Sequence, residues 1–252
     1  MGVTKERIDV LVQRQAEVSR AKASALIRAG AVFGPGGERL DKPGLRIADD
    51  TVLVIRETPR YVSRGGEKLE AALDGFGLNV RDRVAIDVGA STGGFTDCML
   101  QRGAARVYAV DVGYGQLAWA LRQDPRVVVL ERTNIRHLTP ERLAETPSFF
   151  AADCSFISLR LVLPPLTALL ASPAEGVVLI KPQFEAGKED VGKGGVVRDS
   201  AIHARVVDEV LCAAREMGFE SGGVLPSPLL GPAGNREFLA HLRYPSCSKR
   251  SV

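Results

Sequence analysis

Residues 86–94 read Ile-Asp-Val-Gly-Ala-Ser-Thr-Gly-Gly, and a second acid, Asp111, ends the apolar run Val-Tyr-Ala-Val that begins at residue 107. An apolar strand ending in an acid, a glycine turn and a helix from about Phe95 are typical of a doubly wound sheet. The glycines let the backbone approach a ligand closely, and the acid of the second strand binds ribose hydroxyls. The segment therefore predicts an α/β domain that binds a nucleoside-bearing cofactor.

Two details of the turn favour S-adenosylmethionine over a dinucleotide. The dinucleotide fingerprint is Gly-x-Gly-x-x-Gly, whereas Ser91 stands at the position of the middle glycine. Asp87 directly precedes the turn, where its carboxylate would repel a pyrophosphate and attract the cationic amino group of S-adenosylmethionine. The residues predicted to bind this cofactor are Asp87, Gly89, Ser91, Gly93, Gly94, Phe95, Asp111 and Asn134.

The same turn matches a second pattern, the Gly-x-Ser-x-Gly nucleophile elbow of hydrolases, at residues 89–93. That elbow normally follows a middle strand of its sheet, whereas this turn follows the first predicted strand of its domain. The three histidines, His137, His203 and His241, also lack an acid partner in the required order. The cofactor turn is therefore favoured over the hydrolase.

The composition is that of an ordinary globular protein. The chain has 252 residues, 45% of them hydrophobic and 25% charged, which is enough for one large domain and a small one. No segment approaches the ~18 apolar residues of a membrane-spanning helix, and no apolar signal core follows Met1. The four cysteines lack metal-ligand spacing. We therefore expect a cytoplasmic protein with reduced thiols, no metal and no membrane association.

The net positive charge is concentrated near the N-terminus. Residues 1–60 contain 11 Lys and Arg against 8 Asp and Glu, whereas the remainder is balanced at 22 against 22. Helices are predicted over 4–16 and 19–29, and a strand over 51–55. Arg7 and Arg14 are seven residues apart and would share one helical face.

This segment allows two interpretations. It could be a small α+β cap with solvated charges. Its pattern Arg-Ile-Asp…Val-Ser-Arg-Ala-Lys-Ala…Leu-Ile…Gly-Ala-Val also resembles the RNA-binding domain named after ribosomal protein S4. In that family two helices present basic side chains to structured RNA, which agrees with the charge excess.

From Tyr61 onward, predicted strands and helices alternate. The strands are expected over 83–88, 106–111, 126–130, 148–153, 176–181, 219–225 and 236–243. The helices are expected over 64–74, 94–102, 115–121, 139–145, 158–170 and 199–216. Alternating βα units argue for a mostly parallel, three-layer sheet, and the last two strands should form an antiparallel hairpin at its edge. This seven-stranded, Rossmann-like arrangement is that of the class I methyltransferase fold.

Charged residues end two of the apolar strands. Ligands of such sheets bind beyond the carboxyl ends of the strands, where Asp153 and Lys181 are expected. Each would be costly if it were buried without a partner. They could neutralise each other as a structural pair, or they could belong to a reaction centre. Lys68 and Glu237 flank the same edge of the predicted sheet.

These four residues resemble the Lys-Asp-Lys-Glu tetrad of RNA ribose 2′-O-methyltransferases. The surrounding segments are similar to those of the hemolysin A (TlyA) family over about residues 5–244: Tyr-Val-Ser-Arg-Gly-Gly-Glu-Lys-Leu, Asp-Val-Gly-Ala-Ser-Thr-Gly-Gly-Phe-Thr-Asp, Asp-Cys-Ser-Phe-Ile-Ser-Leu, Ile-Lys-Pro-Gln-Phe-Glu and Gly-Gly-Val-Val-Arg-Asp. That family consists of rRNA cytidine 2′-O-methyltransferases with an S4-like N-terminal domain. The resemblance implies a substrate in 16S rRNA, 23S rRNA or both, as RNA or within ribosomal subunits, and leaves the oligomeric state open.

The resemblance also implies a division of the chain. We expect an S4-like domain over 1–56, a linker over 57–60, a methyltransferase domain over 61–245 and a tail over 246–252.

The chemistry of methyl transfer assigns a role to each tetrad residue. A ribose 2′-hydroxyl is a very weak acid, so the enzyme must align oxygen, methyl and sulfur and then remove a proton. Lys181 is the predicted base, provided that burial or a second cation such as Lys68 favours its neutral form. Asp153 would orient Lys181, and Glu237 would position Lys68 or the ribose.

RNA contacts are expected from both parts of the chain. The glycine-rich, charged segment 188–198 is either a flexible surface loop or an RNA-facing loop over the active site. The residues predicted to bind RNA are Arg7, Arg14, Arg20, Lys22, Arg64, Lys193 and Arg198.

Two hypotheses compete with the methyltransferase. A non-catalytic, ribosome-associated RNA-binding protein would not need all four tetrad residues, so their presence argues against it. A membrane-lytic activity is implied by the historical family name, but no basic amphipathic helix of sufficient length supports it.

Overall fold

The computed structural model describes residues 4–28, 30–56 and 59–245 of the chain. Residues 57–58 of the predicted linker and the predicted tail, 246–252, lie outside the described residues.

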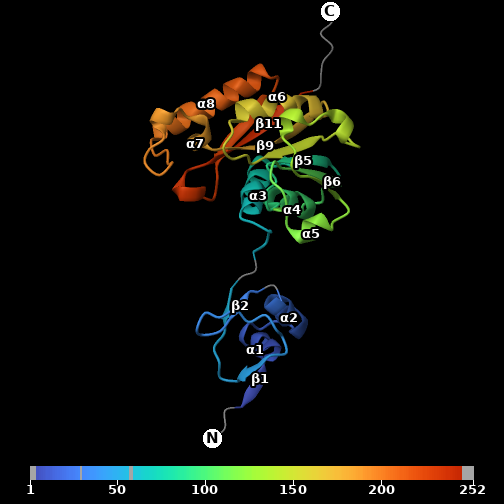
Figure 1. The fold of residues 1–252 in the computed structure, drawn as a ribbon, viewed down its shortest axis with the longest axis vertical. Coiled ribbons are helices and arrows are strands. Elements are labelled where there is room, and N and C mark those ends of the chain that lie inside the picture. Colours follow the sequence, from blue (N-terminus) through green and yellow to red (C-terminus); the bar gives the residue numbers. More distant parts are fainter. Residues whose placement is uncertain (1–3, 29, 57–58, 246–252) are drawn as a thin grey trace, which may run out of the picture. The chain divides into compact units, whose positions relative to one another are not determined.

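The chain is divided into two compact units, Met1–Arg60 and Tyr61–Val252 (Figure 1). Each unit has its own hydrophobic core. One cluster of buried side chains, including Ile8 and Ile27, fills the first unit, and two larger clusters fill the second.

The second unit is built on one seven-stranded sheet with the order β10-β11-β9-β8-β5-β6-β7. The strands are β5 (Val84–Val88), β6 (Arg106–Val110), β7 (Val127–Leu130), β8 (Phe149–Ala152), β9 (Ala174–Ile180), β10 (Glu220–Pro226) and β11 (Phe238–Tyr244). Strands β5 to β9 pair in parallel, whereas β11 is antiparallel to both of its neighbours. The predicted α/β fold, its seven strands and its terminal hairpin are confirmed.

Helices cover both faces of this sheet. They are α3 (Gly65–Phe76), α4 (Gly94–Gln101), α5 (Trp119–Arg122), α6 (Leu159–Leu169), α7 (Pro182–Glu185) and α8 (Ser200–Glu216). Figure 1 shows α3, α4 and α5 on one face and α6 and α8 on the other. Successive strand residues point to opposite faces, so Phe149 joins the core under α3 and α4 while Phe150 joins the core under α6 and α8.

Three helical segments differ from the prediction. The helix predicted over 139–145 is only a 3₁₀ turn, Pro140–Arg142, because Pro140 starts it and Pro147 follows closely. The helix predicted over 115–121 begins late, at Trp119, because Gly115 adopts a φ of 72° that no right-handed helix contains. The short α7 directly after Lys181 was not predicted.

The order of the strands places the expected ligand site at the carboxyl ends of β5 and β8. The chain runs from β5 outward through β6 and β7, then returns to β8 on the other side of β5. The carboxyl ends of β5 and β8 therefore lie side by side at the point where the strand order reverses. Gly89 follows β5 with a φ of 83°, and a Cβ there would lie 2.6 Å from the carbonyl oxygen of Asp153. Only glycine allows the two strand ends to approach this closely.

The first unit combines two helices with two small strand pairs. Strand β1 (Lys5–Arg7) pairs with β3 (Arg46–Ala48), and β2 (Val32–Phe33) pairs with β4 (Val54–Ile55). The helices are α1 (Ile8–Gln15) and α2 (Arg20–Arg28).

The predicted elements of this unit need correction. The first helix starts at Ile8 and not at residue 4, because residues 5–7 pair with β3. Arg7 is therefore the extended residue before α1 and does not share a helical face with Arg14. The strand predicted over 51–55 is reduced to Val54–Ile55, and the last residue of the predicted helix 19–29 lies outside the described residues.

Candidate active site

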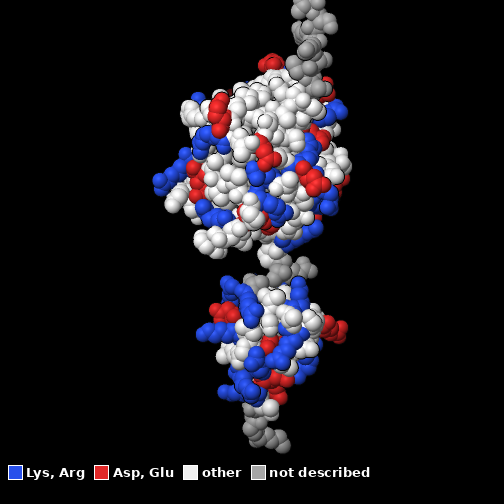
Figure 2. Space-filling model, turned by 90° about the vertical axis from the view of Figure 1, so that its right-hand side faces the viewer, with Lys and Arg blue, Asp and Glu red and all other residues white. Residues whose placement is uncertain are grey.

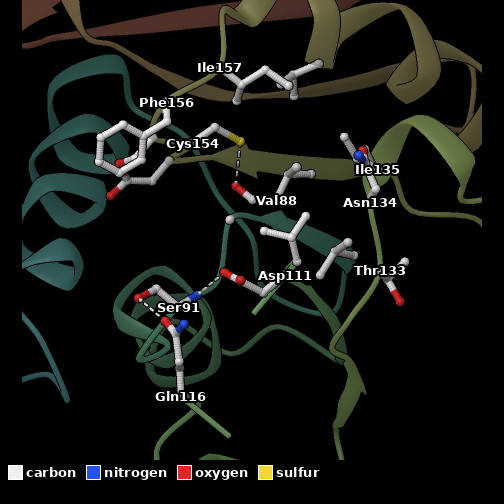
Figure 3. A pocket seen from close by; sticks show the side chains of 16 residues that line it. Val88, Ser91, Asp111, Gln116, Thr133, Asn134, Ile135, Cys154, Phe156 and Ile157 are labelled. Atoms are coloured by element: carbon white, nitrogen blue, oxygen red, sulfur yellow. Dashed lines mark hydrogen bonds between the residues drawn. The ribbon is translucent and has the colours of Figure 1, made fainter. Parts of the chain in front are cut away.

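A cavity of about 610 Å³ opens beyond the carboxyl ends of β5, β6 and β8 (Figure 3). Four of the predicted cofactor residues line it: Gly89, Ser91, Asp111 and Asn134.

The Asp111 carboxylate is fixed in the wall of this cavity. The backbone N–H of Ser91 donates to its Oδ2 at 2.7 Å, and the backbone N–H of Gly113 donates to its Oδ1 at 2.7 Å. The Ser91 hydroxyl in turn donates to Gln116 Oε1 at 3.3 Å (Figure 3). A carboxylate oxygen accepts more than one hydrogen bond, so both oxygens retain capacity for a ligand's hydroxyls. This arrangement fits a ribose diol.

Asp87 lies behind the turn and lines neither cavity of the site. Its side chain is fully buried, and the Thr96 hydroxyl donates to its Oδ2 at 2.6 Å. Its Oδ1 is buried without a hydrogen-bond partner among the described residues. Burial raises the pKa of this carboxyl group to about 7. A buried carboxylate that is costly to ionise and has one oxygen without a hydrogen-bond partner fits a ligand with a positively charged group. The ammonium of S-adenosylmethionine is such a group.

Four of the predicted cofactor residues, Asn134 included, also have local structural roles. Gly93 precedes α4 with a φ of 100°, and Gly94 starts that helix. Phe95 is 3% exposed and belongs to the core under α3 and α4. Asn134 caps a 3₁₀ turn, because its Oδ1 accepts from the backbone N–H of Arg136 at 3.0 Å.

A second cavity, of about 290 Å³, is lined by all four residues of the predicted tetrad: Lys68, Asp153, Lys181 and Glu237. The two cavities share Gly89, Ser91, Asp153 and Ser155 in their walls, so they adjoin. A donor bound in the first cavity and an acceptor bound in the second would therefore meet at these shared residues.

The tetrad forms two ion pairs. Lys68 Nζ donates to Glu237 Oε2 at 2.5 Å, with 11% and 0% of the side chains exposed. Lys181 Nζ lies 2.6 Å from Asp153 Oδ1, with 8% and 21% exposed. Lys181 also donates to the Ser155 hydroxyl at 2.8 Å. Lys181 and Asp153 therefore form the ion pair that the sequence suggested. This pairing does not exclude a role for both residues in a reaction centre.

The four tetrad side chains lie next to the ends of three strands and in one helix. Asp153 directly follows β8, Lys181 directly follows β9, and Glu237 directly precedes β11. Lys68 lies in the first turns of α3. The start of α3 packs against the start of α4 so closely that a Cβ at Gly94 would lie 2.8 Å from the backbone nitrogen of Gly66.

The predicted RNA-binding arginines of the first unit form ion pairs with acidic side chains. Arg7 and Arg20 both bind the buried Asp9, at 2.8 and 3.2 Å, and Arg14 binds Glu6 at 3.0 Å. The hydrogen bond from Arg7 is the main cause that lowers the pKa of Asp9 to about 2. All three guanidinium groups remain substantially exposed, so each retains donors for a further ligand.

The remaining predicted RNA-binding residues are dispersed. Lys22 is exposed on α2, and Arg64 lines the second cavity. Lys193 is exposed in the loop that the Gly192–Val196 bridge closes, Arg198 is exposed two residues beyond it, and neither lines either of the two cavities. On the face of the first unit seen in Figure 2, many Lys and Arg side chains are interspersed with Asp and Glu.

Ser155, Phe156 and Gln116 belong to the cavity walls and were not predicted. Phe156 has a φ of 64°, is 91% exposed and packs its ring 5.0 Å from that of Phe184. A positive φ is unfavourable for a bulky side chain, so the backbone at Phe156 is strained. The sequence signals for Ser155 and Phe156 were their place after an apolar strand that ends in Asp153 and the family-like segment Asp-Cys-Ser-Phe-Ile-Ser-Leu that contains them.

Two further findings concern the described residues alone. No group of three or more His, Cys, Asp or Glu side chains there is placed to hold a metal ion. None of the helices in the described part of the chain has the length and apolarity required to span a lipid bilayer.

The chain resembles known proteins over most of its length. Residues 61–244 match the model of the FtsJ-like methyltransferase family. The 16S/23S rRNA (cytidine-2′-O)-methyltransferase TlyA of Mycobacterium tuberculosis is 51% identical over 94% of this chain and 89% of the relative. Hemolysin A of Brachyspira hyodysenteriae is 42% identical over 88% of this chain and 93% of the relative. A solved hemolysin structure from Streptococcus thermophilus is 50% identical, with a TM-score of 0.74, over 97% of this chain and 90% of that one.

The chain therefore belongs to the FtsJ-like methyltransferase family, and the predicted resemblance to the hemolysin A (TlyA) family is confirmed. The family uses S-adenosylmethionine as methyl donor, as the sequence predicted.

Proposed function

We propose that this methyltransferase transfers a methyl group to the 2′-hydroxyl of a cytidine ribose in 16S rRNA, 23S rRNA or both. The observation that supports this most directly is the pair of adjoining cavities, one with a ribose-binding acid and one lined by the tetrad. The relative from M. tuberculosis carries this activity in its name. Ribosomal RNA as substrate would place the protein in the cytoplasm.

S-adenosylmethionine supplies a methyl group already activated by its sulfonium. In the proposed mechanism Asp111 holds the cofactor's ribose, and Asp87 with the turn from Gly89 to Gly94 holds its methionine end. Lys181 accepts the proton of the 2′-hydroxyl as the methyl group arrives. Asp153 orients Lys181 through their ion pair at 2.6 Å. Glu237 holds Lys68 at 2.5 Å, and Lys68 contributes the second positive charge. Alignment of the reactants supplies much of the acceleration.

RNA recognition is assigned to both units. We propose that the first unit is an S4-like domain, separated from residues 61–245 by the linker 57–60. It would contact phosphates through Arg7, Arg14, Arg20 and Lys22, whose guanidinium and ammonium groups are exposed. Arg64, Lys193 and Arg198 would contact RNA near the active site.

Methyl transfer to isolated 30S subunits, 50S subunits and naked 16S and 23S rRNA tests the proposed function. With labelled S-adenosylmethionine, we expect label in at least one of these RNAs, mapped as a 2′-O-methyl on a cytidine. Label on a base, or on no RNA while the cofactor is bound, would contradict it.

The cofactor can be tested by calorimetry. We expect binding of S-adenosylmethionine and none of NAD, because the Asp87 carboxylate precedes the turn in which a pyrophosphate would lie. Binding of NAD without a response to S-adenosylmethionine would overturn the cofactor site.

The pH dependence of this binding tests Asp87 separately. Its carboxyl group has a pKa raised to about 7, so the fraction ionised increases as the pH rises from 5.5 to 7. The cofactor's α-amino group stays mostly cationic over that range, since such groups titrate at about 7.7–8.0. We expect the affinity to rise several-fold in the native protein and to stay flat in Asp87→Asn. Equal pH dependence in both proteins would show that Asp87 does not bind the ammonium.

A fragment that spans residues 61–252 tests the first unit as the RNA anchor. Because that unit has its own core and carries the charge excess, the fragment should keep its cofactor affinity and lose tenfold or more in affinity for rRNA. Binding by the full chain should weaken with added salt more steeply than binding by the fragment, since neutralised phosphates release counterions. Unchanged rRNA affinity in the fragment would show that the anchor lies in the second unit.

A further inference from the structure

Ser155 lies where the two cavities meet. It follows β8, two residues after Asp153, and it lines both the cavity of Asp111 and the cavity of the tetrad. Its side chain is exposed, so its hydroxyl makes little contribution to the core. Within the described part of the chain, the one hydrogen-bond partner of this hydroxyl is Lys181 Nζ, at 2.8 Å.

The contacts of Lys181 leave one direction of its nitrogen open. A neutral amine carries two N–H groups and one lone pair, arranged tetrahedrally with the carbon that bears them. Ser155 Oγ, at 2.8 Å, accepts an N–H of Lys181, whereas Asp153 Oδ1 lies 2.6 Å from the same nitrogen as an ion-pair partner that is not aligned for a hydrogen bond. Ser155 receives one N–H, and the negative charge of Asp153 keeps the lone pair away from its side, so the lone pair occupies the remaining direction. Without the serine acceptor, the amine could rotate and turn its lone pair away from a substrate.

We infer that Ser155 is a positioning residue that acts with Asp153 to aim the lone pair of neutral Lys181 at the ribose 2′-hydroxyl. This inference rests on the proposed function, in which Lys181 is the base. In the step, the O–H bond of the ribose breaks and a third N–H bond forms on Lys181. The oxygen forms its bond to the methyl carbon as the bond from that carbon to sulfur breaks. The ammonium then pairs with the carboxylate of Asp153, donates to Ser155 and toward the new ether oxygen, and later loses its proton to water.

The test compares Ser155→Ala and Ser155→Thr in the full chain, with the rRNA substrate and S-adenosylmethionine. In Ser155→Ala we expect kcat at neutral pH to fall about tenfold, as expected when a base is misaligned, while KM for both substrates stays unchanged. Ser155→Thr keeps the hydroxyl and should restore most of the rate.

The pH profile of kcat gives a second readout. The serine oxygen accepts a hydrogen bond from the ammonium and therefore favours the protonated amine. Its removal should move the acid limb of the profile to lower pH in Ser155→Ala, and Ser155→Thr should move it back. A merely structural role of Ser155 would leave the position of this limb unchanged.

Ser158 provides a matched control in the same loop. Its hydroxyl donates to Glu185 Oε2 at 2.6 Å and accepts from the N–H of Arg160 at the start of α6, and it does not contact Lys181. Ser158→Ala should lower Tm without moving the acid limb.

Three outcomes would overturn the inference about Ser155: an unchanged kcat in Ser155→Ala, an unmoved acid limb, or no rescue by Ser155→Thr. If Lys181→Ala remains inactive in the same assay, the proposed function survives that failure. If Lys181→Ala is active, the proposed base is wrong, and the inference about Ser155 falls with it.

Discussion

Lys181→Ala is expected to reduce methyl transfer by about 10³-fold or more, because a positioned general base typically contributes ~10²–10⁴-fold. Affinity for S-adenosylmethionine and for rRNA should stay near that of the native protein. Lys181 is needed when the proton leaves, so its loss should appear in turnover and not in ground-state binding. Some loss of stability should accompany the change, because Asp153 loses its ion-pair partner at 2.6 Å.

The Lys181→Arg variant distinguishes two possible roles of Lys181, that of a general base and that of a fixed positive charge. A guanidinium keeps its charge and its donors but stays protonated, so it cannot accept a proton. We expect no rescue. Substantial activity in this variant would show that Lys181 acts as an electrostatic positioner and that the proton leaves by another route. Arg215→Ala, which removes an exposed cation at the end of α8, is a control that should leave turnover unchanged.

The fold of the second unit was predictable because its strands are long, apolar and separated by helices. The acids Asp87 and Asp111 marked two strand ends, and the absence of a helix before β11 predicted the antiparallel hairpin. Elements shorter than one helical turn were not predictable. The strands β1 to β4 contain two or three residues each, too few to show an alternation of apolar and polar side chains.

The site was predictable to a smaller extent. Asp153 and Lys181 could be placed at neighbouring strand ends from the sequence alone. Lys68 and Glu237 are 169 positions apart; the predicted sheet placed both at the same edge, and only the family resemblance joined them to Asp153 and Lys181 in one site. The exposure of Phe156 and the contact of Ser155 with Lys181 depend on how the loop after β8 packs against α7, for which residue types alone give no signal.

Glu237→Ala is expected to destabilise the protein more than the loss of any exposed ion pair. It would leave the ammonium of Lys68 without its partner in a site where only 11% of the lysine side chain is exposed. Breaking a buried pair in this way typically costs about 3–5 kcal/mol of unfolding free energy, which lowers Tm by roughly 10 °C for a domain of this size. The control is Glu209→Ala, which breaks the exposed pairs of Glu209 with Arg160 at 2.6 Å and with Arg205 at 3.6 Å. That change should cost no more than about 1 kcal/mol. Equal losses in the two variants would show that Lys68 finds another partner or reaches water.

The double variant Lys68→Met/Glu237→Leu distinguishes stability from catalysis. Replacing both partners of a buried pair by apolar side chains of similar volume is often neutral or stabilising, so Tm should return toward the native value. Methyl transfer should remain abolished, because the second cation beside Lys181 is gone from the cavity that both lysines line. If the double variant regained activity along with stability, the Lys68–Glu237 pair would be structural, and Asp153 and Lys181 would carry the reaction alone. If the double variant stayed inactive but was well folded and bound the cofactor, the Lys68–Glu237 pair would be needed for catalysis and not for stability, since apolar side chains would replace it in the fold.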